Sequence, residues 1–347
     1  MNLFDILQGL PLWSAILLVV AATLALLALV NSAVARWAER RHPPAGTFID
    51  VDGVRLHYSD RGAGRPVVLL HGNAVTGDDY NTSGVAEQLA GAYRVIIFDR
   101  PGFGYSKRPR GQLWTAAEQA DLIRAALVRL GVGPAVVVGH SWGTLVALAF
   151  AERHPASTAG LVLLSGYYFS TPRLDALLVA PVALPVLGDI LRYTISPLFG
   201  WLTMPLMKRA MFAPAPVTER FKREYSTAMA LRPSQIRASA SDGTLMVPAA
   251  TSLSPHYGAL SMPVAIVAGD GDKVVGSEHA ERMRGAVPDG SLRIVEGAGH
   301  MVHHVATGQV VDAVEEVAKR SERVLEGPSS APKNGYADPM RESRGGR

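Results

Sequence analysis

The sequence predicts an α/β protein with a mostly parallel sheet, an inserted helical segment and an N-terminal membrane-spanning helix. Short runs of Val, Ile and Leu that are apolar on both faces alternate with helical patterns, as in parallel sheets covered by helices. Glycine-rich turns follow several of these runs. Residues 10–30 form an almost unbroken apolar stretch. The 347 residues are enough for a large core after such an anchor.

Composition narrows the classes of function. Hydrophobic residues make up 48% of the chain and charged residues 18%, which is apolar enough for part of the chain to serve a membrane. The net charge of +4 comes from scattered Lys and Arg without a basic run, so we expect no nucleic-acid partner. The chain has no cysteine, which excludes disulfides, a thiolate nucleophile and cysteine metal sites.

Residues 1–41 are expected to be a membrane anchor whose spanning part covers about 10–30. Only Ser14 and Thr23 interrupt the apolar run, and about 20 such residues cross a bilayer as a helix. A signal peptide cleaved after Ala35 and a buried core helix are the alternatives. The run exceeds the usual apolar region of a signal peptide, and no positive charge precedes it. It also lacks a polar face that would meet water at the surface of a core.

The flanks of the apolar run predict its orientation. Arg36, Arg40 and Arg41 follow it, whereas no Lys or Arg precedes it. The positive-inside rule then places the remainder of the chain on the cytoplasmic side. Trp13 and Trp37 flank the run, where interfacial aromatic residues are common. We expect a single-pass membrane protein.

The chain after the anchor divides into a linker, an interrupted sheet domain and a tail. Residues 42–46 read His-Pro-Pro-Ala-Gly and are expected to be a linker. The sheet domain is predicted over 47–166 and 258–325. Between its two parts, the strands stop over 167–257 and apolar helical pieces follow, which indicates a helical cap. Residues 326–347 are rich in Pro, Gly, Ser and charge, and we expect a disordered tail.

The elements of the sheet domain follow in order. A hairpin is expected around the Asp52-Gly53 turn pair within 48–60. Further strands are predicted over 66–71, 94–99, 135–138, 161–165, 264–268 and 292–295. Helices are predicted over 115–130, directly after residue 143, and over 309–325.

The first half of the cap is nearly as apolar as the anchor. Prolines divide residues 174–212 into pieces that are each shorter than a bilayer span. One interpretation is that these helices simply pack on the sheet domain, since apolar helical faces usually form core. The other is that they line an acyl-sized pocket or enter the membrane beside the anchor.

The strongest chemical signal is the segment Gly139-His140-Ser141-Trp142-Gly143. It joins a strand to an Ala- and Leu-rich helix in a G-x-S-x-G pattern, which exposes the serine Oγ at the tip of a strained turn. A serine becomes nucleophilic when an imidazole accepts its proton, and the imidazole needs an acid to orient it. The chain supplies these groups in the order Ser141, Asp272 and His300, each at the end of a predicted strand. They are therefore expected to meet at one edge of the sheet.

Together these features resemble the α/β-hydrolase family, in the serine esterase and lipase-like subgroup with a helical cap after the sixth strand. The resemblance covers about 48–325. Four blocks carry it: His71-Gly72-Asn73, the D-x-P-G-x-G-x-S turn of 99–106, the elbow of 139–143, and the G-x-x-D-x-x-V and G-x-G-H strand endings at 269–275 and 297–300.

The resemblance implies specific roles for five residues. Ser141 would be the nucleophile, His300 the general base and then acid, and Asp272 its orienting partner. The backbone N–H groups of Asn73 and Trp142 would form the oxyanion hole, where each donor is worth roughly 3–4 kcal/mol in the transition state. The Trp142 side chain is expected to shape a pocket under the cap. No cofactor is implied.

Neighbouring residues are expected to support these groups. His71 and Gly72 belong to the oxyanion loop, and Gly139, His140 and Gly143 to the elbow.

Other acidic residues and histidines are weaker candidates. Asp270 is an alternative acid, but the family pattern matches Asp272. Asp99 is expected to hold its own turn. His303 and His304 follow His300 closely, yet no carboxylate joins them at ligand spacing in the sequence. We expect them on a helix surface, without a metal.

The function expected is that of a membrane-anchored serine hydrolase acting on hydrophobic or lipid-like carboxylic esters through an acyl-enzyme. Related epoxide hydrolases and haloalkane dehalogenases attack with an aspartate at the elbow, whereas this chain has a serine there. Hydrolysis of a carbon–carbon bond, acyl transfer and peracid formation by the same triad are alternatives. A further alternative is a non-catalytic binding protein with the same fold.

Overall fold

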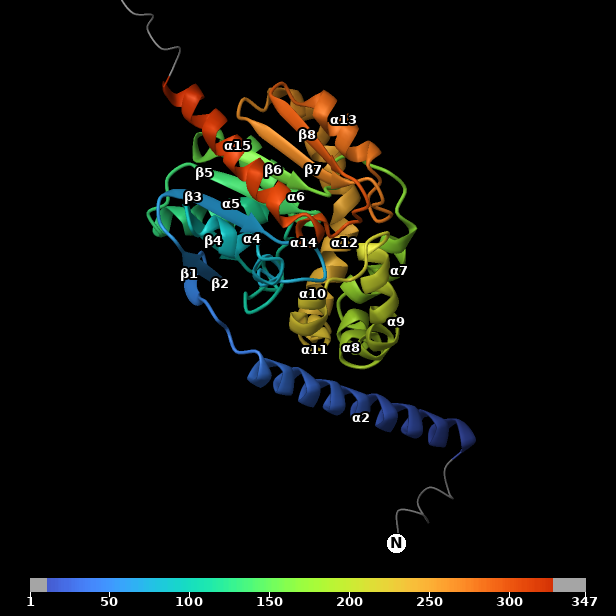
Figure 1. The fold of residues 1–347 in the computed structure, drawn as a ribbon. Coiled ribbons are helices and arrows are strands. Elements are labelled where there is room, and N and C mark those ends of the chain that lie inside the picture. Colours follow the sequence, from blue (N-terminus) through green and yellow to red (C-terminus); the bar gives the residue numbers. More distant parts are fainter. Residues whose placement is uncertain (1–10, 327–347) are drawn as a thin grey trace, which may run out of the picture.

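The computed structural model describes residues 11–326, which form a long N-terminal helix and a sheet-centred body (Figure 1). Helix α2 (Leu12–Arg41) is 30 residues long and runs without interruption through the Ala33-Val34-Ala35 segment of the alternative cleavage site. Its most apolar window has a mean hydropathy of 2.6 and no part of it is buried, which argues against a core helix. By length and composition α2 can cross a membrane.

The body is built on one eight-stranded sheet with the order β1-β2-β4-β3-β5-β6-β7-β8. Its first two strands, β1 (Thr47–Val51) and β2 (Val54–Arg61), form the predicted hairpin, and β2 pairs with β4 in antiparallel fashion. The other strands pair in parallel: β3 (Arg65–Leu70), β4 (Tyr93–Phe98), β5 (Ala135–His140), β6 (Thr158–Leu164), β7 (Val264–Gly269) and β8 (Gly290–Val295). The prediction of a mostly parallel sheet is therefore confirmed, although β6 and β8 begin earlier than expected.

Helices cover both faces of the sheet. One face packs against α5 (Ala116–Arg129), α6 (Trp142–Arg153) and α13 (Glu278–Ala286), and the other against α4 (Val85–Leu89) and α15 (Thr307–Glu326). Alternate residues of each strand serve the two faces, as Val68 and Val67 do in β3. Helices α5, α6 and α15 were predicted, whereas α4 and α13 were not. A disordered tail was expected over 326–347. Glu326 is the last residue of α15, and 327–347 lie outside the described residues.

The cap lies between β6 and β7. It consists of α7 (Leu174–Ala183), α8 (Leu187–Tyr193), α9 (Ile195–Phe212), α10 (Glu219–Glu224), α11 (Thr227–Ala230) and α12 (Pro233–Leu253). The expectation that prolines divide the first half is wrong for α7, which continues through Pro181, and for α9, which continues through Pro205. A proline removes one helical hydrogen bond, and burial of the neighbouring Met204 and of Phe212 on the body side of α9 holds the helix together.

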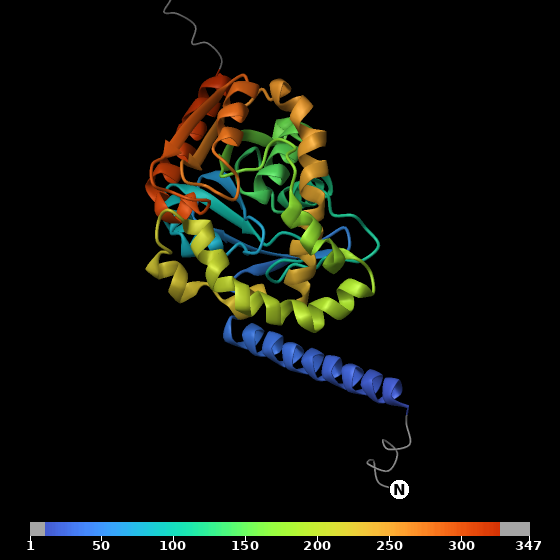
Figure 2. The same ribbon diagram turned by 90° about the vertical axis from the view of Figure 1, so that its right-hand side faces the viewer.

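The C-terminal half of α2 is docked on the cap, below α8, α9 and α11 in both views (Figures 1 and 2). The Asn31 side-chain amide donates hydrogen bonds to the carbonyls of Tyr193 (2.8 Å) and Thr194 (2.9 Å) at the end of α8. Further along, Glu39 forms an ion pair of 2.9 Å with Arg232. The helix and the cap therefore meet over several turns of α2.

Candidate active site

Ser141 is the single residue between the end of β5 and the start of α6. Its backbone has φ 52° and ψ −120°, a strained conformation for a residue with a side chain. The turn is so tight that a Cβ on Gly139 would lie 2.6 Å from the carbonyl oxygen of Gly143. A Cβ on Gly143 would lie 2.3 Å from the carbonyl oxygen of Leu70. Glycine is thus required on both sides of the serine.

The structure brings Ser141, His300 and Asp272 into one hydrogen-bonded chain. The Ser141 Oγ lies 2.9 Å from His300 Nε2, and His300 Nδ1 lies 2.8 Å from Asp272 Oδ2. Asp272 is fixed in turn, because its Oδ1 accepts from the backbone N–H groups of Val274 (2.9 Å) and Val275 (3.0 Å). With the Nδ1 proton donated to the carboxylate, Nε2 is left to accept the serine proton.

Asp270, the alternative acid, is not part of this hydrogen-bonded group. Its Oδ1 accepts a hydrogen bond of 2.8 Å from the backbone N–H of Gly297. It thereby connects the loop after β7 to the loop that carries His300. Asp270 is exposed, whereas Asp272 is buried beside the imidazole.

The two backbone N–H groups expected in the oxyanion hole have no acceptor within residues 11–326. Trp142 is the first residue of α6, so its N–H lies at the positive end of the helix dipole. Asn73 follows β3, and its side chain is occupied elsewhere. The side-chain oxygen of Asn73 accepts from the Ala74 N–H at 3.0 Å, and its side-chain NH₂ donates to the Ser239 carbonyl at 3.0 Å.

The loop that carries Asn73 is held from behind by His71 and Arg100. His71 Nδ1 donates to the Gly72 carbonyl (2.7 Å), and its Nε2 accepts from the Arg100 backbone N–H (3.0 Å). The Arg100 guanidinium donates to the carbonyls of His71 (2.8 Å) and Gly72 (3.0 Å). Burial, followed by the charge of Arg100, lowers the pKa of His71 to about 4. The imidazole is therefore neutral, as these two hydrogen bonds require.

A buried ion pair joins this loop to the cap, and it was not predicted from the sequence. Arg100 donates to Asp242 of α12 at 2.5 Å, and Arg108 donates to the same carboxylate at 2.8 Å. The Trp142 indole N–H donates to the Asp242 carbonyl at 2.8 Å. The Trp142 side chain is therefore buried against α12. Arg100 lies in the recognised 99–106 turn, but no motif marks Asp242.

The expectation that His303 and His304 lie on a helix surface is wrong. Both lie in α14 (Val302–Val305) and are buried, and their Nε2 atoms contact the Asp79 carboxylate at 2.7 and 2.8 Å. Asp79 begins α3 (Asp79–Thr82), so a carboxylate does join these histidines from a distant part of the sequence. Burial alone would raise the pKa of Asp79, but the two histidines lower it well below its usual range.

The Asp79 cluster also reaches the elbow through His140. Atoms of Asp79, His140 and His303 that could bind a metal lie within 4.8 Å of one another. The contacts to Asp79 have hydrogen-bond lengths, and the two histidine donors account for both of its oxygens. His140 Nε2 in turn donates to the His300 carbonyl at 3.1 Å. These hydrogen bonds link the elbow to the loops that carry Asn73 and His300.

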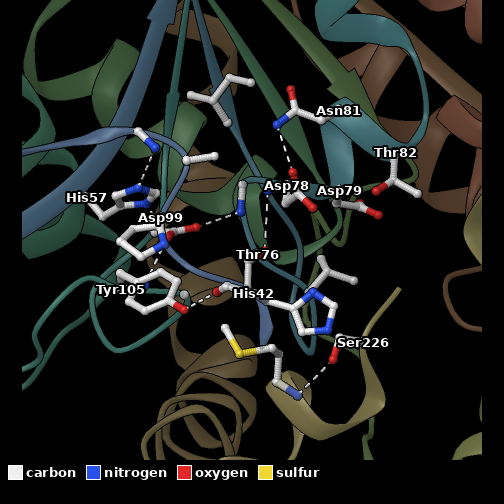
Figure 3. A pocket seen from close by; sticks show the side chains of 18 of the residues that line it. His42, His57, Thr76, Asp78, Asp79, Asn81, Thr82, Asp99, Tyr105 and Ser226 are labelled. Atoms are coloured by element: carbon white, nitrogen blue, oxygen red, sulfur yellow. Dashed lines mark hydrogen bonds and ion pairs between the residues drawn. The ribbon is translucent and has the colours of Figure 1, made fainter. Parts of the chain in front are cut away.

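Asp99 holds its turn, in the position expected for it. Its carboxylate accepts from His57 Nδ1 (2.7 Å) and from the backbone N–H groups of Gly77 (2.8 Å) and Tyr105 (2.9 Å). Figure 3 shows His57, Asp99 and Tyr105 together along one wall of a cavity. The Tyr105 hydroxyl donates to the His42 carbonyl, which ties this wall to the end of α2.

This cavity measures about 390 Å³ and lies beside the loop that carries Asn73. The linker after α2, the hairpin, residues 74–79 and helices α10 and α11 surround it. Neither Ser141, Asp272 nor His300 is among its lining residues. The cavity is therefore separate from the hydrogen-bonded Ser141, His300 and Asp272, although its lining includes Ala74, the residue after Asn73.

Comparison with known proteins agrees with this architecture. The family profile for the α/β-hydrolase fold matches residues 65–307. An uncharacterised protein of Mycobacterium tuberculosis is 30% identical over 292 residues, covering 79% of this chain and 81% of its own. A 2-hydroxymuconate semialdehyde hydrolase of Pseudomonas putida is 33% identical over 135 residues, covering 39% of this chain and 48% of its own.

Two solved structures have similar folds. An esterase from Thermogutta terrifontis superposes with a TM-score of 0.62 at 23% identity, covering 80% of this chain and 99% of the esterase. A bacterial membrane phospholipase A superposes with a TM-score of 0.62 at 20% identity, covering 90% of this chain and 98% of the phospholipase.

Proposed function

Because the chain belongs to the α/β-hydrolase family, which includes esterases and carbon–carbon bond hydrolases, we propose that it is a serine hydrolase of carboxylic esters. The observation that carries this proposal is the hydrogen-bonded chain of Ser141, His300 and Asp272 at the tip of a strained turn. The family and the nature of its other members support enzymatic hydrolysis in general. The geometry at Ser141 supports the narrower chemistry.

In the proposed reaction the Ser141 Oγ attacks the ester carbonyl carbon while His300 Nε2 takes the serine proton. Asp272 stabilises the resulting imidazolium, and the N–H groups of Asn73 and Trp142 bind the negative oxygen of the tetrahedral intermediate. The intermediate collapses to an acyl-enzyme as His300 gives its proton to the departing alcohol. Water then attacks the acyl carbon with His300 again as base, which releases the carboxylic acid. No step requires a cofactor or metal.

We further propose that the substrates are hydrophobic or lipid-like and that α2 anchors the enzyme in a membrane. The exposed apolar surface of α2 and of the cap supports this. The fold similarity to a membrane phospholipase A over 90% of this chain is in keeping with it. The arginines after the apolar run favour a body on the cytoplasmic side.

The test of the nucleophile is labelling with a fluorophosphonate probe. The full-length protein is expected to react, and Ser141→Ala is expected to abolish the reaction. Failure of the folded wild-type protein to react, or unchanged labelling of Ser141→Ala, would refute a serine hydrolase. For the substrate, rates on p-nitrophenyl esters should rise from acetyl to longer acyl chains. A flat or falling series would argue against an acyl-sized site.

One observation favours a second candidate, the hydrolysis of a carbon–carbon bond. It is the identity of 33% to a 2-hydroxymuconate semialdehyde hydrolase over part of the chain. The same triad would serve this reaction. Turnover of that semialdehyde faster than of any ester in the series would favour the second candidate.

The anchor has its own test. Full-length protein in bacterial membranes should resist extraction by alkaline carbonate. Release into the wash would contradict a spanning helix, and a mature N-terminus at Arg36 would establish the cleaved signal peptide instead.

A further inference from the structure

The outer surface of the cap is apolar over several neighbouring helices. On α9 exposed apolar residues recur at helical spacing on one face: Ile195, Leu198, Phe199, Leu202 and Leu206. Leu202 is 75% exposed and Leu206 71%. Exposed apolar side chains of α7, of α8 and of the residue before α8 extend this surface: Leu178, Val186, Leu187 and Ile190. A contiguous patch on this scale marks an interaction site.

The position of α2 indicates what covers this surface. Leu24, Leu27, Ala28 and Asn31 are partly buried at spacings of three and four residues, so they form the side of α2 that faces the body. Asn31 bonds to the end of α8, and at 1.5 Å per residue Leu24 lies about 10 Å deeper in the apolar stretch. The contacts between α2 and the body thus extend into the segment expected to cross the bilayer.

From this geometry we propose that the outer face of α8 and α9 is a bilayer-docking surface, inserted into the same leaflet in which α2 ends. The inference rests on the proposed membrane anchor. The bilayer is the occupant because helix α9 lies beside α2 in both views and each helix carries exposed apolar side chains, so one membrane reaches both. Trp201 provides an aromatic residue suited to the interface, and Arg209 an exposed cation near the end of α9.

The docked face is connected to the proposed active site. Where α9 ends, the Met211 carbonyl accepts a hydrogen bond of 3.2 Å from the backbone N–H of Met301, the residue after His300. The adjacent Gly299 is so close that a Cβ there would lie 2.3 Å from the Ala213 carbonyl oxygen. A lipid that enters from the leaflet along α9 would therefore arrive next to the loop that carries the general base.

The absence of cysteine from the chain allows a direct depth measurement. Spin labels are attached at Leu202→Cys and Leu206→Cys in the full-length protein, reconstituted in phosphatidylethanolamine and phosphatidylglycerol vesicles. Leu26→Cys on α2 serves as the bilayer reference. Ile294→Cys serves as the aqueous reference, because Ile294 is an exposed apolar residue of β8 at the end of the body away from α2 (Figure 1). Collision rates with oxygen and with a neutral nickel chelate then report the depth of each label.

Labels at Leu202 and Leu206 should collide preferentially with oxygen, like the label at Leu26, while the label at Ile294 should prefer the nickel chelate. The inference is overturned if the two cap labels behave like Ile294 while Leu26 lies in the bilayer. It is also overturned if they are shielded from both reagents and show spin–spin broadening that disappears on dilution with unlabelled protein, since a second copy would then cover the face.

Two further results separate this inference from the proposals on which it rests. An aqueous label at Leu26 would refute the anchor, and the docking surface with it, while leaving fluorophosphonate labelling of Ser141 intact. Quenching of tryptophan fluorescence by brominated lipids provides a second measurement without a label. The quenching should fall in Trp201→Phe, and an unchanged value would count against insertion of α9.

Discussion

Replacing Asp242 by alanine should strongly destabilise the protein. The carboxylate lies on α12 of the cap and has no exposed side-chain surface. It accepts from Arg100 at 2.5 Å and from Arg108 at 2.8 Å, and the Arg100 and Arg108 side chains are 0% and 5% exposed. Asp242→Ala leaves two buried guanidinium groups without their counter-ion. Removing one partner of a buried pair costs about 3–5 kcal/mol, most of it from the charge left behind.

The assay is guanidinium unfolding of the full-length protein in detergent micelles, followed by tryptophan fluorescence. The matched control is Asp121→Ala. Asp121 is 41% exposed and pairs with Arg153, itself 47% exposed, so its loss should cost no more than about 1 kcal/mol. Asp242→Asn keeps one acceptor oxygen, so its loss of unfolding free energy should lie between those of Asp242→Ala and Asp121→Ala. In a thermal scan, the loss expected for Asp242→Ala corresponds to a Tm lower by about 5–8 °C.

The reasoning would be refuted if Asp242→Ala were within about 1 kcal/mol of Asp121→Ala. That result would mean that water reaches Arg100 and Arg108 in the folded protein. The same variant bears on the site, because Arg100 also holds the carbonyls of His71 and Gly72 next to Asn73. At a temperature where Asp242→Ala remains folded, we expect slower fluorophosphonate labelling than in Asp121→Ala.

Three further predictions follow from single contacts. Burial and the charge of Arg100 lower the pKa of His71 to about 4, so His71 gains a proton at a higher pH in the unfolded chain than in the folded protein. The free energy of unfolding should therefore fall by about 3 kcal/mol, at ~1.4 kcal/mol per pH unit, as the pH decreases from 6.5 toward 4. Unfolding curves that match at pH 7.5 and 4.5 would contradict this. Asp272→Asn should lower kcat on a soluble ester about 10³–10⁴-fold with little change in KM, because the imidazole loses its fixed tautomer; a loss of less than tenfold would remove Asp272 from the triad. Asp79→Ala removes the acceptor of two buried histidine N–H donors and should reduce the free energy of unfolding by about 3–5 kcal/mol. A reduction below about 1 kcal/mol would mean that water replaces the carboxylate.

The sequence predicted the parts of the fold that depend on local patterns. The hairpin turn at Asp52-Gly53, the parallel strands and the elbow at Ser141 are encoded in short runs of residues, and all of them are present in the structure. Ser141, Asp272 and His300 were brought together by one topological rule, since parallel strands end at the same edge of a sheet. Their hydrogen bonds agree with that expectation, while their catalytic roles stay a prediction for the labelling experiment.

The contacts that sequence reasoning missed join distant segments through a buried charge. Asp79 meets His303 and His304, and Asp242 meets Arg100, without any spacing rule that relates them. A periodicity argument treats a charged residue in a helical segment as surface, because most such residues are solvated. Only tertiary packing shows that these carboxylates are paired inside, so their roles could not be read from the chain.

The buried contacts of α12 with the sheet domain restrict how the cap can move. Helix α12 is fixed to the body through Asp242 and the Trp142 indole, whereas α9 is joined near its end by the backbone contact from Met211 to Met301. Opening the cap at α12 would expose an ion pair whose separation is costly. Displacement of α8 and α9 breaks no buried ion pair with the sheet domain among the described residues, and their outer face is apolar. A bilayer that holds this face would therefore act on the side of the cap that can yield, next to His300.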